Sequence, residues 1–121
     1  MGNKEKLLPP EPIEYPFILT IDPKRLTNRG QLYTTQEFID KEKLKRALNG
    51  DIDTKYPIPK GHWWKEREAI VLGDGNHRTA VAYIQDSTIE VEIVGPFDGS
   101  KKPIPFNVFI RNYTSGMGLE Y

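Results

Sequence analysis

The sequence contains no cysteine, and this absence excludes several kinds of chemistry. Without a thiol the chain has no disulfide framework, no thiolate nucleophile and no zinc site with cysteine ligands. Histidine is scarce as well, with only His62 and His77 in 121 residues. A zinc site needs at least three protein ligands, and nothing in the sequence sets the two histidines beside each other. We therefore predict no metal site built from these side chains.

An excess of charge and a long apolar run are also missing. The 17 basic and 17 acidic residues cancel, which argues against a global positive field for nonspecific nucleic-acid binding and leaves only a local basic patch. No apolar run approaches the roughly 18 residues of a membrane-spanning helix, and no signal-peptide pattern opens the chain. We expect a soluble cytoplasmic protein without a membrane partner, and the sequence leaves its oligomeric state open.

The length suits one domain with a thin core, since hydrophobic residues make up 37% of the chain. Three prolines stand within four positions, at Pro9, Pro10 and Pro12. Neither a helix nor the interior of a sheet accepts such a run. We predict a flexible, proline-rich N-terminal tail over residues 1–14 and one domain over residues 15–121.

Hydrophobic patterning predicts an α+β fold, with a small mixed β-sheet and short helices. Residues 69–72 are apolar on both faces, as in a buried central strand, whereas residues 88–94 alternate between apolar and acidic. The spacing of apolar residues after Gly75 predicts a helix over 76–85. Two further strands are expected at 17–21 and 106–110.

The segment between the first two strands carries turn and helix signals. Asp22-Pro23 ends the first strand and predicts a turn. Thr34-Thr35-Gln36-Glu37 fits a capping box, which predicts that a short helix begins after Thr34. That helix should break at Asp40, which would cap a second helix, and Asn49-Gly50 should end the second helix.

Residues with chemical potential gather at 72–79, where the buried strand runs into Gly73 and Gly75 and a helix starts at once. Glycine allows a sharp turn and the close approach of a ligand. The start of a helix offers unpaired N–H groups and the positive end of its dipole, which together suit an anion. Arg78 adds a planar, permanently charged group. The spacing matches neither the P-loop nor the G-x-G-x-x-G motif.

The succession of a strand, Asp74-Gly75-Asn76-His77-Arg78, a helix with Ala80, Ala82 and Tyr83, and a strand from Thr88 resembles the ParB/sulfiredoxin superfamily. ParB-like domains show a similar Asp-Gly-x-(His/Arg)-Arg step. The resemblance implies that Gly75, Asn76, His77 and Arg78 line a pocket for nucleotide phosphates, to which Gly73 and Thr79 would belong. It implies ATP or CTP with Mg²⁺ as the cofactor.

The chain departs from this superfamily in two places. Asn76 stands where sulfiredoxins carry their catalytic cysteine, so the reduction of sulfinic acid is excluded. Chromosome-partitioning ParB proteins continue into a helix-turn-helix domain, whereas 27 residues follow Val94 here. We therefore expect a stand-alone ParB-like unit, of the kind that includes nucleotide binders, small-molecule kinases and proteins labelled nucleases.

Each candidate residue at the glycine step has a structural interpretation beside the functional one. His77 lies on the apolar face of its helix, where its ring would contact a ligand or hold the glycine loop in place. Asp74 and His77 are the candidates for a catalytic role. Asp74 would hold Mg²⁺ or act as a base, or it would only shape the turn. Arg78 would contact phosphate or form a surface ion pair. Thr79 would donate to phosphate or only fill the first helical turn.

A second candidate set precedes the buried strand, at Lys60, His62, Trp63 and Trp64. Neighbouring tryptophans on a strand point to opposite faces, so one of them would be exposed. An exposed Trp or His ring stacks on bases, and a flanking lysine contacts phosphate. In the structural interpretation, one tryptophan fills the core and the other covers its edge.

Three functions follow from these residues. The leading hypothesis is a nucleotide-phosphate-binding domain that catalyses phosphoryl transfer or nucleotide hydrolysis at the Gly73–Arg78 turn. The alternative is a ParB-like DNA-binding or nuclease module, which would make nucleic acid the partner. The third hypothesis is a non-catalytic interaction protein with the same fold.

Overall fold

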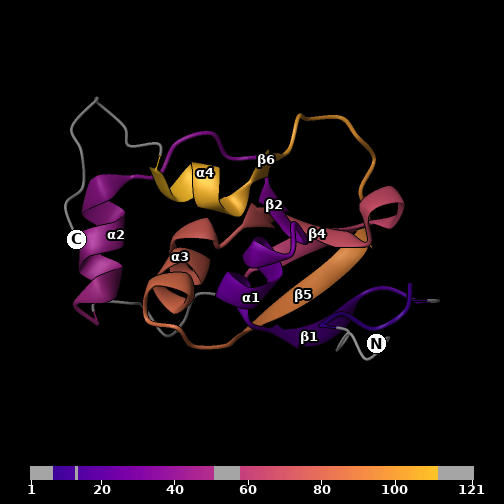
Figure 1. Cartoon of the computed structure of the whole chain (residues 1–121), viewed down its shortest axis with the longest axis horizontal. Helices are drawn as coiled ribbons and strands as arrows, with labels where there is room; N and C mark the ends of the chain where they lie inside the picture. The colour runs from indigo at the N-terminus through magenta and orange to yellow at the C-terminus, as the bar shows by residue number, and fades with distance from the viewer. Residues whose placement is uncertain (1–6, 13, 51–57, 112–121) are drawn as a thin grey trace.

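The computed structural model describes residues 7–12, 14–50 and 58–111, which form a small α+β domain around a six-stranded sheet (Figure 1). The strands lie in the order β1–β5–β3–β4–β2–β6. Their bounds are β1 Phe17–Ile21, β2 Leu32–Thr34, β3 Lys60–Trp64, β4 Ala69–Asp74, β5 Ile89–Pro96 and β6 Ile104–Pro105. The predicted α+β class with a mixed sheet and short helices is confirmed.

Parallel and antiparallel pairs alternate across the sheet. Strands β1 and β5, β3 and β4, and β2 and β6 pair antiparallel, whereas β5 and β3, and β4 and β2, pair parallel. Strands β3 and β4 occupy the centre. The first four residues of β4 are all buried, as predicted for 69–72, and the strand continues through Asp74.

Four α-helices contribute to the hydrophobic cluster on one face of this sheet (Figure 1). Their bounds are α1 Pro23–Asn28, α2 Lys41–Leu48, α3 Asn76–Ile84 and α4 Phe106–Arg111, and a short 3-10 turn, η1, spans Lys65–Arg67. Leu26, Leu44, Ala80 and Phe109 bring one buried side chain from each helix into the cluster. None of the described helices is long and apolar enough to cross a membrane.

The predicted turn at Asp22–Pro23 is the start of helix α1. Asp22 is its N-cap and accepts a hydrogen bond from the Arg25 N–H at 3.1 Å, and Pro23 occupies the first helical position. Proline is favoured there, because its missing N–H would have no partner within the helix and its φ suits the first turn. The strand-ending interpretation was therefore correct, but the same two residues also begin a helix.

The capping-box prediction at Thr34 was wrong. Thr34 is the last residue of β2 and lies beside Leu72 of β4 in the parallel register. Its hydroxyl accepts a hydrogen bond from the Gln36 N–H, but no helix follows before Asp40. The second half of the prediction is confirmed, because Asp40 caps α2 and accepts from the N–H groups of Glu42 and Lys43.

The predicted strand at 106–110 is also wrong, because these residues form helix α4. Phe106, Phe109 and Ile110 are buried on one side of it, at the i, i+3, i+4 spacing of a helix. The strand in this region is the two-residue β6, which pairs with β2 at the edge of the sheet. Pro105 is tolerated in β6 because an edge strand does not need every N–H.

Part of the N-terminal segment packs on the domain. The side chain of Leu8 is 7% exposed and belongs to the core cluster. Glu11 lies 3.9 Å from the Lys65 ammonium. The boundary between a tail over 1–14 and a domain over 15–121 remains a prediction, and both ends of the chain lie outside the described residues.

The face of the sheet opposite the α-helices is called the outer face here. Tyr33 of β2 and His62 of β3 are both register partners of Val71, and Trp64 of β3 pairs with Ala69. These side chains therefore point to the outer face. Beyond them the exposed side chains of Ile18 and Val94 continue this face onto β1 and β5.

Candidate functional site

The predicted site is the turn between the central strand β4 and helix α3. The strand changes into the helix through a single residue, Gly75, which is the N-cap of α3 and has a left-handed conformation with φ of 76°. Gly73 and Asp74, at the end of the strand, are exposed. Because glycine has no side chain, the N-terminus of α3 has no side-chain cap, and its first N–H groups have no partner within the helix.

Gly75 is required here by its backbone conformation and by its neighbour. A Cβ atom added at this position would lie 2.5 Å from Cβ of Pro59. The Pro59 carbonyl accepts a 2.8 Å hydrogen bond from the N–H of Glu92 in β5, which holds Pro59 in place. The turn is therefore supported by the segment that leads into β3, and any side chain at 75 would displace it. Nothing lies within 4 Å of a Cβ added at Gly73, so that side of the turn is open.

Asn76 serves the structure of the turn through its side chain. It is only 2% exposed. Its Oδ1 accepts a hydrogen bond from the Thr34 hydroxyl at 2.7 Å, and its Nδ2 donates to Oε1 of Gln36 at 3.1 Å. These bonds join the first residue of α3 to the end of β2. The amide is thus used inside the protein, and a ligand would meet the backbone of Asn76 rather than its side chain.

Thr79 is likewise turned inward. Its hydroxyl donates to the carbonyl of Gly75 at 2.9 Å and its side chain is fully buried. The structural interpretation of this residue, that it fills the first helical turn, fits the geometry. Asp74, by contrast, is exposed at the mouth of the turn.

His77 links α3 to the start of α2. Its Nε2 accepts a 2.8 Å hydrogen bond from the backbone N–H of Asp40, the N-cap of α2. Its ring also lies edge-on to Phe109, with centroids 6.3 Å apart. Burial and, second, the Lys43 ammonium lower the pKa of His77, against an opposing effect of the Asp40 carboxylate. The His77 ring therefore has a structural role, but it joins α3 to α2 through an N–H donor, whereas the structural interpretation had it hold the glycine loop.

Two basic residues of the predicted set lie near the turn. Arg78 is half-buried in the first turn of α3. Lys60 is the register partner of Asp74, and its ammonium lies 3.8 Å from the carboxylate of Glu92. Arg78 thus lies in the first turn of α3 and Lys60 beside the end of β4, with the Lys60 ammonium paired to Glu92.

The set at Lys60, His62, Trp63 and Trp64 divides between the two faces of the sheet. Trp63 is 3% exposed and belongs to the core. Trp64 is half-buried on the outer face, where its ring contacts those of Tyr33 and Phe97. Burial therefore excludes Trp63 from base stacking, and Trp64 is the half-buried member of the pair.

Residues that support the turn were not recognised in the sequence. Thr34, Gln36 and Asp40 contact α3 from 37 to 42 positions away along the chain, and Pro59 underlies Gly75. No local pattern indicates such distant pairs. Among the described residues there is no group of three His, Asp or Glu side chains that could hold a metal ion.

Comparisons with protein-family models, with curated proteins and with solved structures found no match for this chain. The resemblance to the ParB/sulfiredoxin superfamily thus remains a prediction from the residues of the glycine step.

Proposed function

We propose that the Gly73–Arg78 turn binds the phosphate groups of a nucleotide, ATP or CTP with Mg²⁺, in a ParB-like unit. One observation carries the proposal. Gly75, which has a left-handed backbone and packs closely against Pro59, connects the central strand directly to a nine-residue helix that has no side-chain cap. This geometry suits an anion, because the helix start presents N–H donors and the positive end of the dipole.

Binding in this proposal depends on the main chain and on Arg78. The side chains of Asn76 and Thr79 are buried and hydrogen-bonded within the protein. The backbone N–H groups of the first turn of α3 would contact phosphate oxygens, and the Arg78 guanidinium would add a fork of charged donors. Gly73 leaves room for a ligand to approach the backbone, because no atom fills the space of a missing side chain.

Asp74 is the residue at this turn that would act with Mg²⁺. Magnesium is commonly held by one or two carboxylates together with substrate phosphates, so an exposed carboxylate beside a phosphate site is sufficient. His77 is a poor candidate for the general base, since its Nε2 already accepts the Asp40 N–H. The backbone N–H groups of α3 and the Arg78 guanidinium would also stabilise the negative charge that develops during phosphoryl transfer.

Isothermal titration calorimetry with ATP, CTP and ADP, each with Mg²⁺, tests the proposal. Two variants probe separate parts of the site: Arg78→Ala removes the charge, and Gly73→Val fills the open side. Gly95→Val in β5 is the matched control, because a Cβ there also meets nothing within 4 Å. We expect each site variant to weaken binding about tenfold or more, which corresponds to about 1.4 kcal/mol, while Gly95→Val binds like the unmodified protein.

Two results would contradict the proposal. The first is the absence of binding at millimolar nucleotide by protein that circular dichroism shows to be folded. The second is binding that Gly73→Val and Gly95→Val change equally, because the ligand would then lie elsewhere. Hydrolysis of the bound nucleotide, followed by phosphate release, separates a catalytic site from a binding site.

A further inference from the structure

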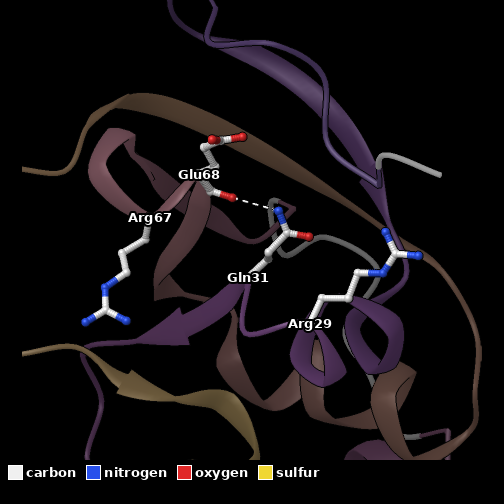
Figure 2. A pocket seen from close by; sticks show the side chains of 4 residues that line it. All are labelled: Arg29, Gln31, Arg67 and Glu68. Carbon is white, nitrogen blue, oxygen red and sulfur yellow. Dashed lines mark hydrogen bonds between the residues drawn. The ribbon is translucent and has the colours of Figure 1, made fainter. Parts of the chain in front are cut away.

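A surface pocket of about 540 Å³ lies at the opposite end of the sheet from the glycine turn, and it is lined by Arg29, Gln31, Arg67 and Glu68 (Figure 2). Gln31 directly precedes β2 and Glu68 directly precedes β4. Because these two strands are parallel, the pocket sits at their amino ends, while Gly75 follows the carboxyl end of β4. It is a shallow hollow that is open to solvent rather than an enclosed cavity.

The floor of this pocket is held by hydrogen bonds on three sides of Gln31. Its N–H donates to the Leu26 carbonyl at 2.8 Å, and its carbonyl accepts from the N–H of Ile70 at 3.0 Å. Its side-chain Nε2 donates to the Glu68 carbonyl at 2.9 Å (Figure 2). Glu68 has a left-handed backbone with φ of 48°, a conformation that costs free energy for a residue with a side chain. The backbone segments that carry Arg29 and Arg67 are therefore joined to each other by the hydrogen bond between Gln31 and Glu68.

The guanidinium groups and the carboxylate of the pocket are separated from one another. Figure 2 shows Arg67 and Arg29 extending to opposite sides of Gln31, and the Glu68 carboxylate pointing away from both. Two positive charges at separate positions suit a long ligand that carries several anionic groups along its length. Arginine is well suited to phosphate because its planar fork donates two parallel hydrogen bonds.

An aromatic cluster adjoins the Arg67 side of the pocket. The Arg67 guanidinium carbon lies 5.3 Å from the centre of the Trp64 ring. The Trp64 ring meets Tyr33 edge-on at 5.1 Å and Phe97 at 5.3 Å. Trp64 and Tyr33 belong to the outer face of the sheet, on which none of the described α-helices packs. Aromatic rings and arginine planes are the surfaces on which unpaired bases stack.

We propose that this pocket and the adjoining aromatic cluster bind single-stranded nucleic acid. Arg29 and Arg67 contact separate, non-adjacent phosphates of the strand, and bases stack on the surface formed by Trp64, Tyr33 and Phe97. The aromatic cluster favours nucleic acid over an acidic peptide or a free phosphate, neither of which needs such a surface. The balanced net charge limits the affinity, because only the local arginines neutralise phosphates.

Fluorescence anisotropy with labelled oligo(dT) and oligo(U) tests the proposal. With two phosphates contacted, the logarithm of the binding constant should fall against the logarithm of salt concentration with a slope of about −1.4. Arg67→Gln and Arg29→Gln should each weaken binding several-fold and reduce the size of the slope by about 0.7. Arg46→Gln, at an exposed arginine of α2, is the matched control and should leave both values unchanged.

Stacking is tested by Trp64→Leu, which should weaken binding about tenfold, within the range measured for loss of one stacked base. The melting temperature of each variant shows whether the fold is kept, and the arginine variants test the site independently of Trp64. If oligo(dT) and oligo(U) bind with equal affinity, the site recognises phosphate and base. If oligo(U) binds more tightly, the site also contacts the 2′-hydroxyl. Both results support a single-stranded site.

Three results would overturn the proposal. The first is no binding of either oligonucleotide at about 50 mM salt. The second is equal competition by polyphosphate, which has charge but no bases. The third is equal weakening by Arg67→Gln and Arg46→Gln. Gly73→Val leaves this pocket intact, so oligonucleotide binding by that variant separates this inference from the nucleotide proposal.

Discussion

The hydrogen bond between His77 and Asp40 makes stability depend on pH in a defined direction. The backbone N–H of Asp40 donates to Nε2 of His77 over 2.8 Å, and a protonated ring has no lone pair to accept it. Burial, followed by the nearby Lys43 ammonium, lowers the pKa of His77 below its ordinary value of 6.5. The folded protein therefore resists taking up a proton that the unfolded chain binds readily.

The magnitude follows from this difference in proton binding. Above pH 6.5 both states carry a neutral ring and His77 contributes no pH dependence. As the pH falls below that value, the unfolded chain is protonated first, and the free energy of unfolding decreases by up to about 1.4 kcal/mol for each pH unit. The loss stops below the lowered pKa of the folded protein, where both states are protonated.

Urea unfolding followed by tryptophan fluorescence, between about pH 8 and pH 5, measures this slope. His77→Gln is the decisive variant, because its side-chain carbonyl can accept the Asp40 N–H without titrating. The slope between pH 6.5 and the lower end of the range should flatten in His77→Gln and persist in the control variant His62→Gln. Hydrogen bonds from Lys43 N–H and Glu42 N–H lower the pKa of Asp40, so its carboxylate titrates only under more acidic conditions.

An unchanged slope in His77→Gln would refute the reasoning, because His77 would then not be the group whose protonation opposes folding. If His62→Gln removed the pH dependence to the same extent, the reasoning would also be refuted, because the effect would not be specific to His77. The hydrogen bond itself is tested by His77→Ala at neutral pH. Leaving a half-buried N–H without its partner should cost about 1–3 kcal/mol.

Further variants test the packing around the glycine turn, each by urea or thermal unfolding. Gly75→Ala combines a left-handed backbone with a clash against Pro59 and should lose about 2–5 kcal/mol, whereas Gly73→Ala should change stability by less than about 0.5 kcal/mol; equal losses would contradict this. Asn76→Ala leaves a buried hydroxyl without its acceptor and should lose about 1–3 kcal/mol, so a neutral result would show that this network is not stabilising. Trp63→Ala removes a core side chain and should lose about 3–5 kcal/mol, clearly more than Trp64→Ala.

The elements with strong periodic patterns could be predicted from the sequence. The alternation of apolar and acidic residues over 88–94 corresponds to β5, and the apolar run at 69–72 corresponds to the buried part of β4. The helix predicted over 76–85 corresponds to α3. These patterns are informative because burial on one face, or on both, leaves a regular trace over enough residues.

The short elements could not be predicted, because three to six residues do not show a period. At Thr34, a capping-box pattern was outweighed by pairing with β4, which uses the Thr34 backbone in the sheet. At 106–110, valine, isoleucine and phenylalanine favour a strand, but burial of Phe106 and Phe109 in the core, where their rings contact Tyr83 and His77 of α3, decides for α4. Tertiary packing thus overrides weak local preference.

The strand-to-helix turn at Gly75 could be predicted from the sequence, but the roles of the side chains around it needed the structure. His77 was open between a ligand contact and a structural support, and its bond to Asp40 supplies a structural role. Asn76 and Thr79 were candidates for ligand contact, and their side chains are used inside the protein. Such roles depend on partners distant in the chain, which spacing does not reveal.

Because Asn76 and Thr79 form hydrogen bonds within the protein, their side chains are not available to a ligand at this turn. If the groups that meet a ligand belong mainly to the peptide bonds, an alanine scan would report losses of folding and, Arg78 apart, almost nothing about recognition. Replacing single amides of the first turn of α3 by esters, through semisynthesis, would remove one N–H donor while leaving every side chain in place. Amide-to-ester replacement would therefore report on ligand recognition at this turn more directly than side-chain substitution. The chain has 121 residues and no cysteine, so it would be assembled by a ligation in which the cysteine at the junction is afterwards converted to alanine.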